Sequence, residues 1–216
     1  MKAVFKFRLL AIALIILIGV PSIGNLAAEF IRPSKDPLAS TIKAPSNSGQ
    51  LSAAKLSTSI APLREDLKAD YALLLTGKAL NGERDLNNTA AAAFKDALRI
   101  GPHDTEAWLG LALLQLQATS VDPRAAEFLK MAYLTGPNQA ELIPVRLMAL
   151  TSNNALTDPD LRELARADVR VLLAQGSDGR SILLGMFKHA TEAGKQFIDD
   201  STRIIDPDFA TRYRAQ

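Results

Sequence analysis

Paired carboxylates near the C-terminus are the first candidates in this sequence for acid–base chemistry. Two carboxylates can act as acid and base when a cleft holds them at a defined separation. Asp199 and Asp200 are adjacent in a predicted helix, where neighbouring side chains point about 100° apart and do not face each other. Asp206 and Asp208 flank a proline at a predicted helix end, which favours a turn. The spacing of these pairs therefore indicates structural roles.

The two histidines lack the partners that catalysis or metal binding requires. His103 follows a proline in a predicted turn, and His189 shares a helical face with Glu192. The chain has no cysteine, so it has no disulfide, thiolate nucleophile or cysteine metal site. A Gly-rich phosphate loop, a nucleophile elbow and a His-Glu-x-x-His pair are also absent from the sequence. We therefore expect no catalytic residue, metal or cofactor, and a non-enzymatic protein.

The charge of the chain is unevenly distributed, which bears on its partners. Seven basic and two acidic residues precede Pro62, whereas 18 basic and 21 acidic residues follow the same position. The basic excess therefore belongs to the N-terminal arm. Nucleic-acid binding needs a basic surface that neutralises phosphates, and residues 62–216 do not supply one. We expect no nucleic-acid partner.

The first 30 residues predict a membrane segment. Three basic residues lie within the first eight positions, and no further charge occurs until Glu29. Residues 9–28, at about 1.5 Å per residue, just span a hydrocarbon core of about 30 Å. The basic end should stay in the cytoplasm and the rest of the chain should cross the membrane. In a bacterium, this places the C-terminal part in the periplasm and residues 9–28 in the inner membrane.

Two interpretations of this segment remain open. A signal anchor would retain residues 1–30 as a single transmembrane pass. A signal peptide would be cleaved near Ala28 and would release the remainder into the periplasm. The anchor is favoured for two reasons. A small-x-small cleavage site needs a small residue at the third position before the cleaved bond, and Asn25 or Leu26 at that position fits poorly. The uncharged stretch is also long for a signal peptide.

Residues 31–61 predict a disordered linker. The segment is rich in Ser, Ala, Pro and Lys, and from Arg32 to Ala61 it has no aromatic residue. Such a composition buries too little apolar surface to offset the entropy of ordering the chain.

Residues 62–216 predict a domain made only of helices. Apolar residues such as Leu63, Leu67 and Tyr71 recur at helical spacing, and no stretch shows convincing strand alternation. Asp104 is a suitable N-cap, and Gly-Pro pairs mark helix ends. The expected architecture is an all-α stack of antiparallel helix hairpins.

A repeat lies in the middle of this domain. The stretch from Ala97 to Pro102 recurs 35 positions later as the stretch from Ala132 to Pro137. A period in this range is typical of stacked two-helix repeats. Small residues would let paired helices approach, large residues would fill the gaps, and each proline would end a unit.

The pattern resembles the tetratricopeptide repeat (TPR) family, with about two repeats in residues 71–137. That family places small, large and proline residues at fixed positions of its paired helices. The matching positions are Ala90, Phe94, Ala97 and Pro102, then Trp108, Leu111 and Ala112, then Ala125, Leu129, Ala132 and Pro137. The resemblance implies an α-solenoid that binds peptides or helices of other proteins.

The resemblance also implies where a peptide would bind. In this family, certain first-helix residues line a concave groove, and the matching positions are Leu109, Leu113 and Leu116. All three are apolar, which suits an apolar peptide or helix. Alternatively, C-terminal helices of the same chain cover the row. Self-coverage is favoured, because an exposed leucine row would promote aggregation.

The sequence thus favours a membrane-tethered periplasmic scaffold that binds cell-envelope proteins of unknown identity. A homotypic structural protein, in which repeats of different copies stack, is one alternative. A less favoured alternative is an envelope enzyme with its site in residues 157–216.

Overall fold

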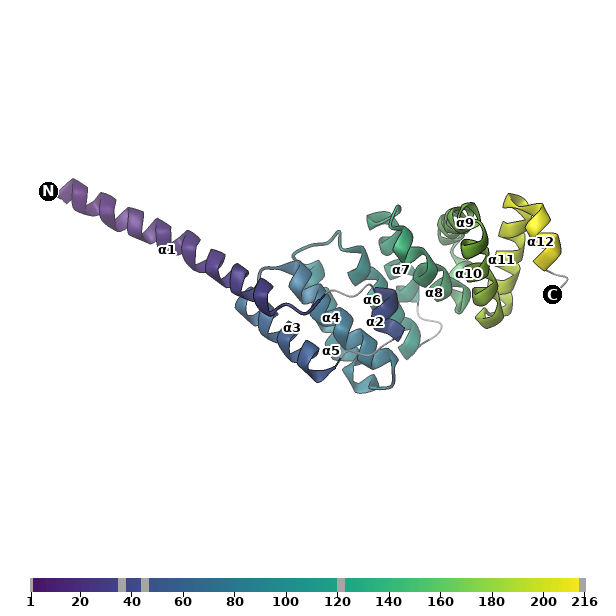
Figure 1. Cartoon of the computed structure of the whole chain (residues 1–216), viewed down its shortest axis with the longest axis horizontal. Helices are drawn as coiled ribbons and strands as arrows, with labels where there is room; N and C mark the ends of the chain where they lie inside the picture. Colours follow the sequence, from purple (N-terminus) through teal and green to yellow (C-terminus); the bar gives the residue numbers. More distant parts are fainter. Residues whose placement is uncertain (1, 35–37, 44–46, 120–122, 214–216) are drawn as a thin grey trace.

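In the computed structural model, the described residues are 2–34, 38–43, 47–119 and 123–213. Every regular element in these ranges is a helix, which confirms the predicted all-α class (Figure 1). The α-helices are α1 (Lys2–Ile31), α2 (Leu38–Lys43), α3 (Ser48–Ile60), α4 (Glu65–Leu80), α5 (Asn87–Leu98), α6 (Thr105–Ala118), α7 (Pro123–Thr135), α8 (Ile143–Thr151), α9 (Pro159–Ala174), α10 (Ser177–His189), α11 (Glu192–Ile205) and α12 (Pro207–Tyr213). Short 3₁₀ turns cover Arg84–Leu86, Ala140–Leu142 and Asn154–Thr157.

Helix α1 extends away from the remaining helices (Figure 1). Its segment Leu10–Ile31 is 22 residues long and apolar, and an 18-residue stretch of it is not buried by the rest of the chain. At about 1.5 Å per residue, it covers the thickness of a hydrocarbon core. The helix is therefore long and apolar enough to span a membrane or to serve as a signal sequence.

The predicted disordered linker is wrong for residues 48–60, which form α3. A capping box starts this helix: the Asn47 side chain accepts from the Gln50 amide at 2.8 Å, and the Gln50 side chain accepts from the Asn47 amide at 3.0 Å. Helix α3 packs against both α1 and α4 through the buried Ala54 and Ser57. The Ser- and Ala-rich composition thus provides small residues for close helix contacts. Residues 35–37 and 44–46 of the predicted linker lie outside the described residues.

The repeat residues lie in two consecutive helix pairs, α4 with α5 and α6 with α7. Asp104 caps α6 by accepting a hydrogen bond from the Ala107 amide at 3.0 Å. A Cβ atom on Gly110 would lie 2.3 Å from the Phe94 ring, which is too close for a real contact. Helices α5 and α6 can therefore pack this closely because Gly110 has no side chain. The fully or nearly fully buried repeat positions are Ala90, Phe94, Ala97, Leu111, Ala112, Ala125, Leu129 and Ala132. Trp108 is partly buried, and Pro102 and Pro137 are exposed after the helix ends.

The C-terminal helices continue the same hydrophobic core. Helix α8 contacts α6, α9, α10 and α11, and α11 also contacts α9 and α12. Buried residues from α4 through α11 form one continuous apolar cluster. The repeat pairs and the C-terminal helices therefore share a core.

Candidate functional site

The three leucines of the predicted groove are core residues. Leu109 is completely buried, Leu113 is 9% exposed, and Leu116 is partly buried against the same core. Helices α4, α5, α7 and α8 all pack against α6. The possible groove at Leu109, Leu113 and Leu116 is therefore not open, which agrees with the favoured alternative that the chain covers this row itself. The helices that pack against α6 include α4, α5 and α7, and not only the C-terminal helices that were expected.

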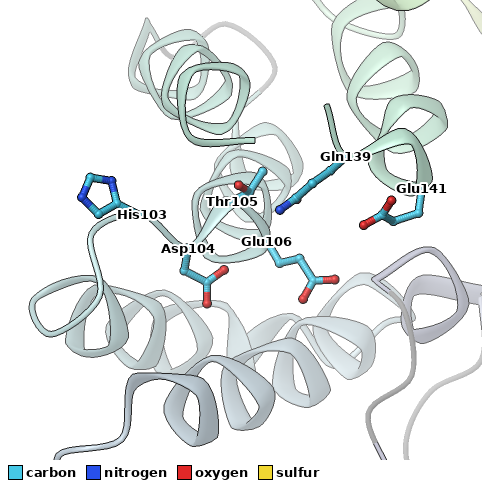
Figure 2. A pocket seen from close by; sticks show the side chains of 6 residues that line it. All are labelled: His103, Asp104, Thr105, Glu106, Gln139 and Glu141. Carbon is cyan, nitrogen blue, oxygen red and sulfur yellow. The ribbon is translucent and has the colours of Figure 1, made fainter. Parts of the chain in front are cut away.

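An open polar hollow lies at the start of α6 instead (Figure 2). Its volume is about 270 Å³, and its lining comes from the turn before α6, the first residues of α6 and the segment after α7. The lining residues are His103, Asp104, Thr105, Glu106, Gln139 and Glu141. Three carboxylates give the hollow an acidic character. Among the described residues, however, no three His, Asp or Glu side chains are placed so that they could hold one metal ion.

Three of the carboxylates that could have done chemistry, those of Asp199, Asp200 and Asp206, are ion-paired. Asp199 and Asp200 lie 2.7 Å and 3.5 Å from the guanidinium of Arg203. Asp206 lies 2.7 Å from Arg180 and also accepts from a backbone amide one turn later at 3.1 Å. His103 and His189 are exposed and lie on different elements. The structure does not bring these groups into one site.

A buried polar cluster joins the repeat pair to the C-terminal helices. The Arg146 side chain is completely buried on α8, and its Nε and one terminal nitrogen donate to the two carboxylate oxygens of Asp168 at 3.2 Å and 3.0 Å. Its other terminal nitrogen donates to the Gly136 carbonyl at 2.7 Å. The guanidinium also lies 4.4 Å from the centre of the Tyr133 ring. One arginine thereby contacts α7, the segment after α7, and α9.

Burial controls the ionisation of this cluster. It raises the pKa of Asp168 above its usual value, and the positive charge of Arg146 only partly opposes this effect. Burial and the nearby negative charge of Asp168 raise the pKa of the Tyr133 phenol. Since Arg146, Tyr133 and Asp168 are all buried, we assign the cluster to the stability of the helix stack.

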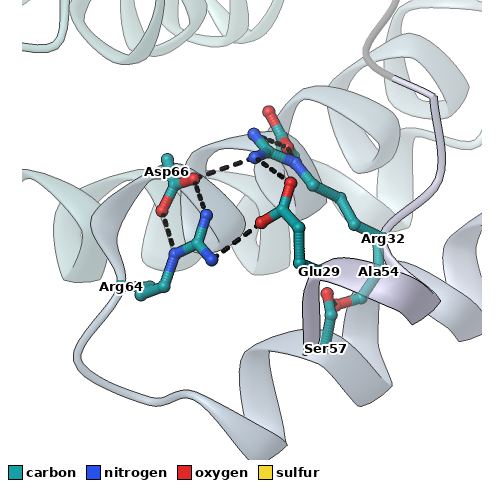
Figure 3. A network of polar contacts seen from close by, with 7 residues as sticks. Glu29, Arg32, Ala54, Ser57, Arg64 and Asp66 are labelled. Atoms are coloured by element: carbon teal, nitrogen blue, oxygen red, sulfur yellow. Dashed lines mark hydrogen bonds and ion pairs between the residues drawn. The ribbon is translucent and has the colours of Figure 1, made fainter. Parts of the chain in front are cut away.

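A second polar cluster, the α1–α4 ion network, fixes the end of α1 to the body (Figure 3). It consists of Glu29, Arg32, Arg64, Asp66 and Asp70. Arg32 lies 2.6 Å from Asp70 and 3.0 Å from Asp66. Arg64 lies 2.7 Å from Glu29 and pairs with Asp66 at 2.5 Å. Two arginines thus alternate with three carboxylates between α1 and the start of α4.

The electrostatic environment favours the charged forms in this network. Hydrogen bonds from Arg64 hold the pKa of Asp66 below its ordinary value. The hydrogen bonds that Arg64 donates to the carboxylates of Asp66 and Glu29 raise the pKa of Arg64. Burial opposes the charge on Arg32, but the carboxylates of Asp70, Asp66 and Glu29 together outweigh this effect and the Arg32 pKa is raised.

A small apolar contact lies beside the ion network. Ala28 of α1 is completely buried and clusters with Ala61 and Leu67. One turn earlier, a Cβ atom on Gly24 would lie 3.5 Å from the Ile60 carbonyl oxygen. The last two turns of α1 are therefore built into the helical body rather than attached through a free linker.

The sequence contained a signal for the Arg146–Asp168 cluster. Asp168 lies on the apolar stripe of α9 with Leu161, Ala165 and Leu172, and Arg146 lies within an apolar stretch of α8. A charged residue on an apolar face indicates a buried partner on another element. The partner itself could not be identified, because the pairing depends on how α8 and α9 pack.

Comparisons with protein-family models, with curated proteins and with solved structures found no significant match to this chain.

Proposed function

We propose that this chain is a membrane-tethered scaffold that binds other proteins of the bacterial cell envelope. The proposal rests on one observation: ion pairs join the end of the exposed apolar helix α1 to the start of α4 in the helical body. A rigid connection of this kind suits a protein that presents a binding surface at a fixed position relative to a membrane.

The body fits a TPR-like α-solenoid. The 35-residue recurrence, the pairing of α4 with α5 and of α6 with α7, and the burial of the small repeat residues all support this proposal. Solenoids of stacked hairpins commonly present extended surfaces for peptides and helices of partners. Because the leucine row of α6 is covered, we place the partner site on other exposed surfaces.

The proposed location is the inner membrane, with α1 as a single pass and the body in the periplasm. Basic residues at positions 2, 6 and 8 support a cytoplasmic N-terminus. The burial of Ala28 against Ala61 and Leu67 supports a retained anchor, because cleavage after Ala28 would remove a residue from the domain's own core.

Site-specific photo-crosslinking of the full chain in native membranes tests the binding role. A photoreactive residue would replace an exposed apolar side chain on α7, α9 or α11, namely Leu134, Val171 or Ile204. We expect one or more of these positions to give a discrete adduct with another protein. The matched control is the buried Leu129, which should give none. Absence of adducts at all three exposed positions would refute this proposal for these surfaces.

A reporter fused after Gln216 tests the location. An enzyme that is active only in the periplasm should be active in this fusion, and a reporter active only in the cytoplasm should be inactive. The opposite pattern would refute the proposed topology.

A further inference from the structure

Two highly exposed apolar side chains lie where α1 joins the body. Phe30 is 84% exposed and Leu63 is 82% exposed. Phe30 belongs to the last turn of α1, and Leu63 belongs to the turn between α3 and α4. Burial of such side chains is worth about 1.5–3 kcal/mol each, so their exposure calls for an explanation.

The contacts on both sides of Leu63 fix the level of this turn along α1. Before it, Ile60 packs beside Gly24 and Ala61 packs against Ala28. After it, Arg64 pairs with Glu29 at 2.7 Å. The turn therefore runs beside α1 between the levels of Gly24 and Glu29.

The ion network indicates where along α1 the hydrocarbon core of the bilayer ends. Glu29 is half exposed, and a charged side chain is costly inside hydrocarbon, so the hydrocarbon should end just before this residue. Gly24 lies five residues earlier, which is about 7.5 Å along the helix axis. A moderate tilt of α1 shortens this depth only slightly. The end of α3 and the following turn thus lie at the depth of the membrane interface.

Two backbone amides of the turn are paired within the protein, which suits that depth. Polar backbone groups must be paired where water is scarce. The Ala61 amide donates to the Ser57 carbonyl at 3.1 Å, and the Arg64 amide donates to the Ala61 carbonyl at 3.2 Å. Pro62 has no amide hydrogen to satisfy.

We propose that residues 60–63, the end of α3 and the turn that follows it, insert into the bilayer interface beside α1, with Leu63 and Phe30 in contact with lipid. The inference rests on the proposed membrane anchor and extends it. The body then contacts the membrane at two points, the helix α1 and this turn, which restricts its rotation relative to the bilayer. The occupant of the apolar surface is lipid, because the surface is continuous with the lipid-facing length of α1.

Spin labels on single cysteines test the proposal directly. The chain has no native cysteine, so each variant needs one substitution. Leu63→Cys would be labelled in the full chain, reconstituted into vesicles of phosphatidylethanolamine and phosphatidylglycerol. Collision rates with oxygen, which concentrates in lipid, and with a water-soluble nickel chelate would then be compared.

Two matched positions calibrate the result. Leu17→Cys lies midway along α1 and is 71% exposed, whereas Leu134→Cys lies on α7 and is 61% exposed. We expect the oxygen-to-nickel ratio at Leu63 to exceed the ratio at Leu134 severalfold and to remain below the ratio at Leu17, because an interfacial position is shallower than the centre of the bilayer. A circular dichroism spectrum like that of the unsubstituted chain verifies folding of each variant.

The remaining outcomes separate the two proposals. A lipid-like ratio at Leu17 with a water-like ratio at Leu63 would overturn the inserted turn and leave the anchor intact. A water-like ratio at Leu17 would overturn the anchor and the inserted turn together. Protection of Leu63 from both reagents would overturn lipid contact in favour of contact with a second copy of the chain.

Discussion

Arg146 and Asp168 form a bidentate ion pair between α8 and α9, and the Arg146 side chain has no exposed surface. The Arg146 guanidinium lies over the face of the Tyr133 ring, next to the end of the second repeat unit. The ion pair therefore fixes the position of the C-terminal helices relative to the repeat pair.

Replacement of Arg146 by methionine should be strongly destabilising. The variant leaves the Asp168 carboxylate buried without its partner, and a loss of about 3–5 kcal/mol in the free energy of unfolding is expected. Urea denaturation of the full chain in detergent, followed by circular dichroism, measures this loss. The double variant Arg146→Met, Asp168→Leu should lose clearly less, because it leaves no unpaired charge. Equal losses in the single and double variants would contradict the account.

Replacement of Gly110 by alanine should destabilise the repeat pair. The new methyl group would lie 2.3 Å from the ring of the fully buried Phe94, and overpacking of this kind costs about 1–3 kcal/mol. Thermal or urea denaturation provides the measurement. The control is Gly185→Ala in α10, where nothing lies within 4 Å of the added atom. The control should be neutral or stabilising by up to about 1 kcal/mol, and a Gly110 variant as stable as this control would contradict the close helix contact.

Replacement of Arg32 by methionine should loosen α1 from the body. Asp70, whose side chain is only 7% exposed, would lose its ion pair with Arg32. Hydrogen–deuterium exchange should therefore rise in the amides of residues 28–32 and 64–70. Arg203→Met is the matched control, because Arg203 is 56% exposed and its pairs on α11 lie at the surface, where such pairs contribute little. Unchanged exchange at residues 64–70 would count against the network as a structural joint.

Acid should weaken the α1–α4 ion network through Asp66. The folded-state pKa of Asp66 lies below its ordinary value of 3.8, so the unfolded chain binds this proton more readily. The stabilising contribution is complete well above 3.8 and is lost as the pH falls through the folded-state pKa. Asp66→Asn removes the contribution at every pH. The stability difference between wild type and variant should shrink below 3.8, and a constant difference would refute this role.

The helical class and the repeat residues were predictable because they depend on local spacing. Phe94 and Leu129 are completely buried, as their positions in the repeat pattern indicate, and the Asp104 cap is formed. The membrane-length helix was also predictable from a continuous apolar run.

Features that depend on distant contacts were not predictable. The segment containing Ala54 and Ser57 has the composition of a linker, yet contacts with α1 and α4 order it as a helix. Similarly, the spacing of Leu109 and Leu113 on α6 could not show which neighbouring helices cover them. Each of these outcomes depends on packing between elements far apart in the chain.

The central claim is that α1 stays attached and holds the helical body at a membrane. The most direct test is the intact mass of the chain recovered from carbonate-washed membranes. The account predicts the full-length mass of 23.3 kDa in the membrane fraction. A shorter chain that lacks the residues up to about Ala28, found in the soluble fraction, would contradict it.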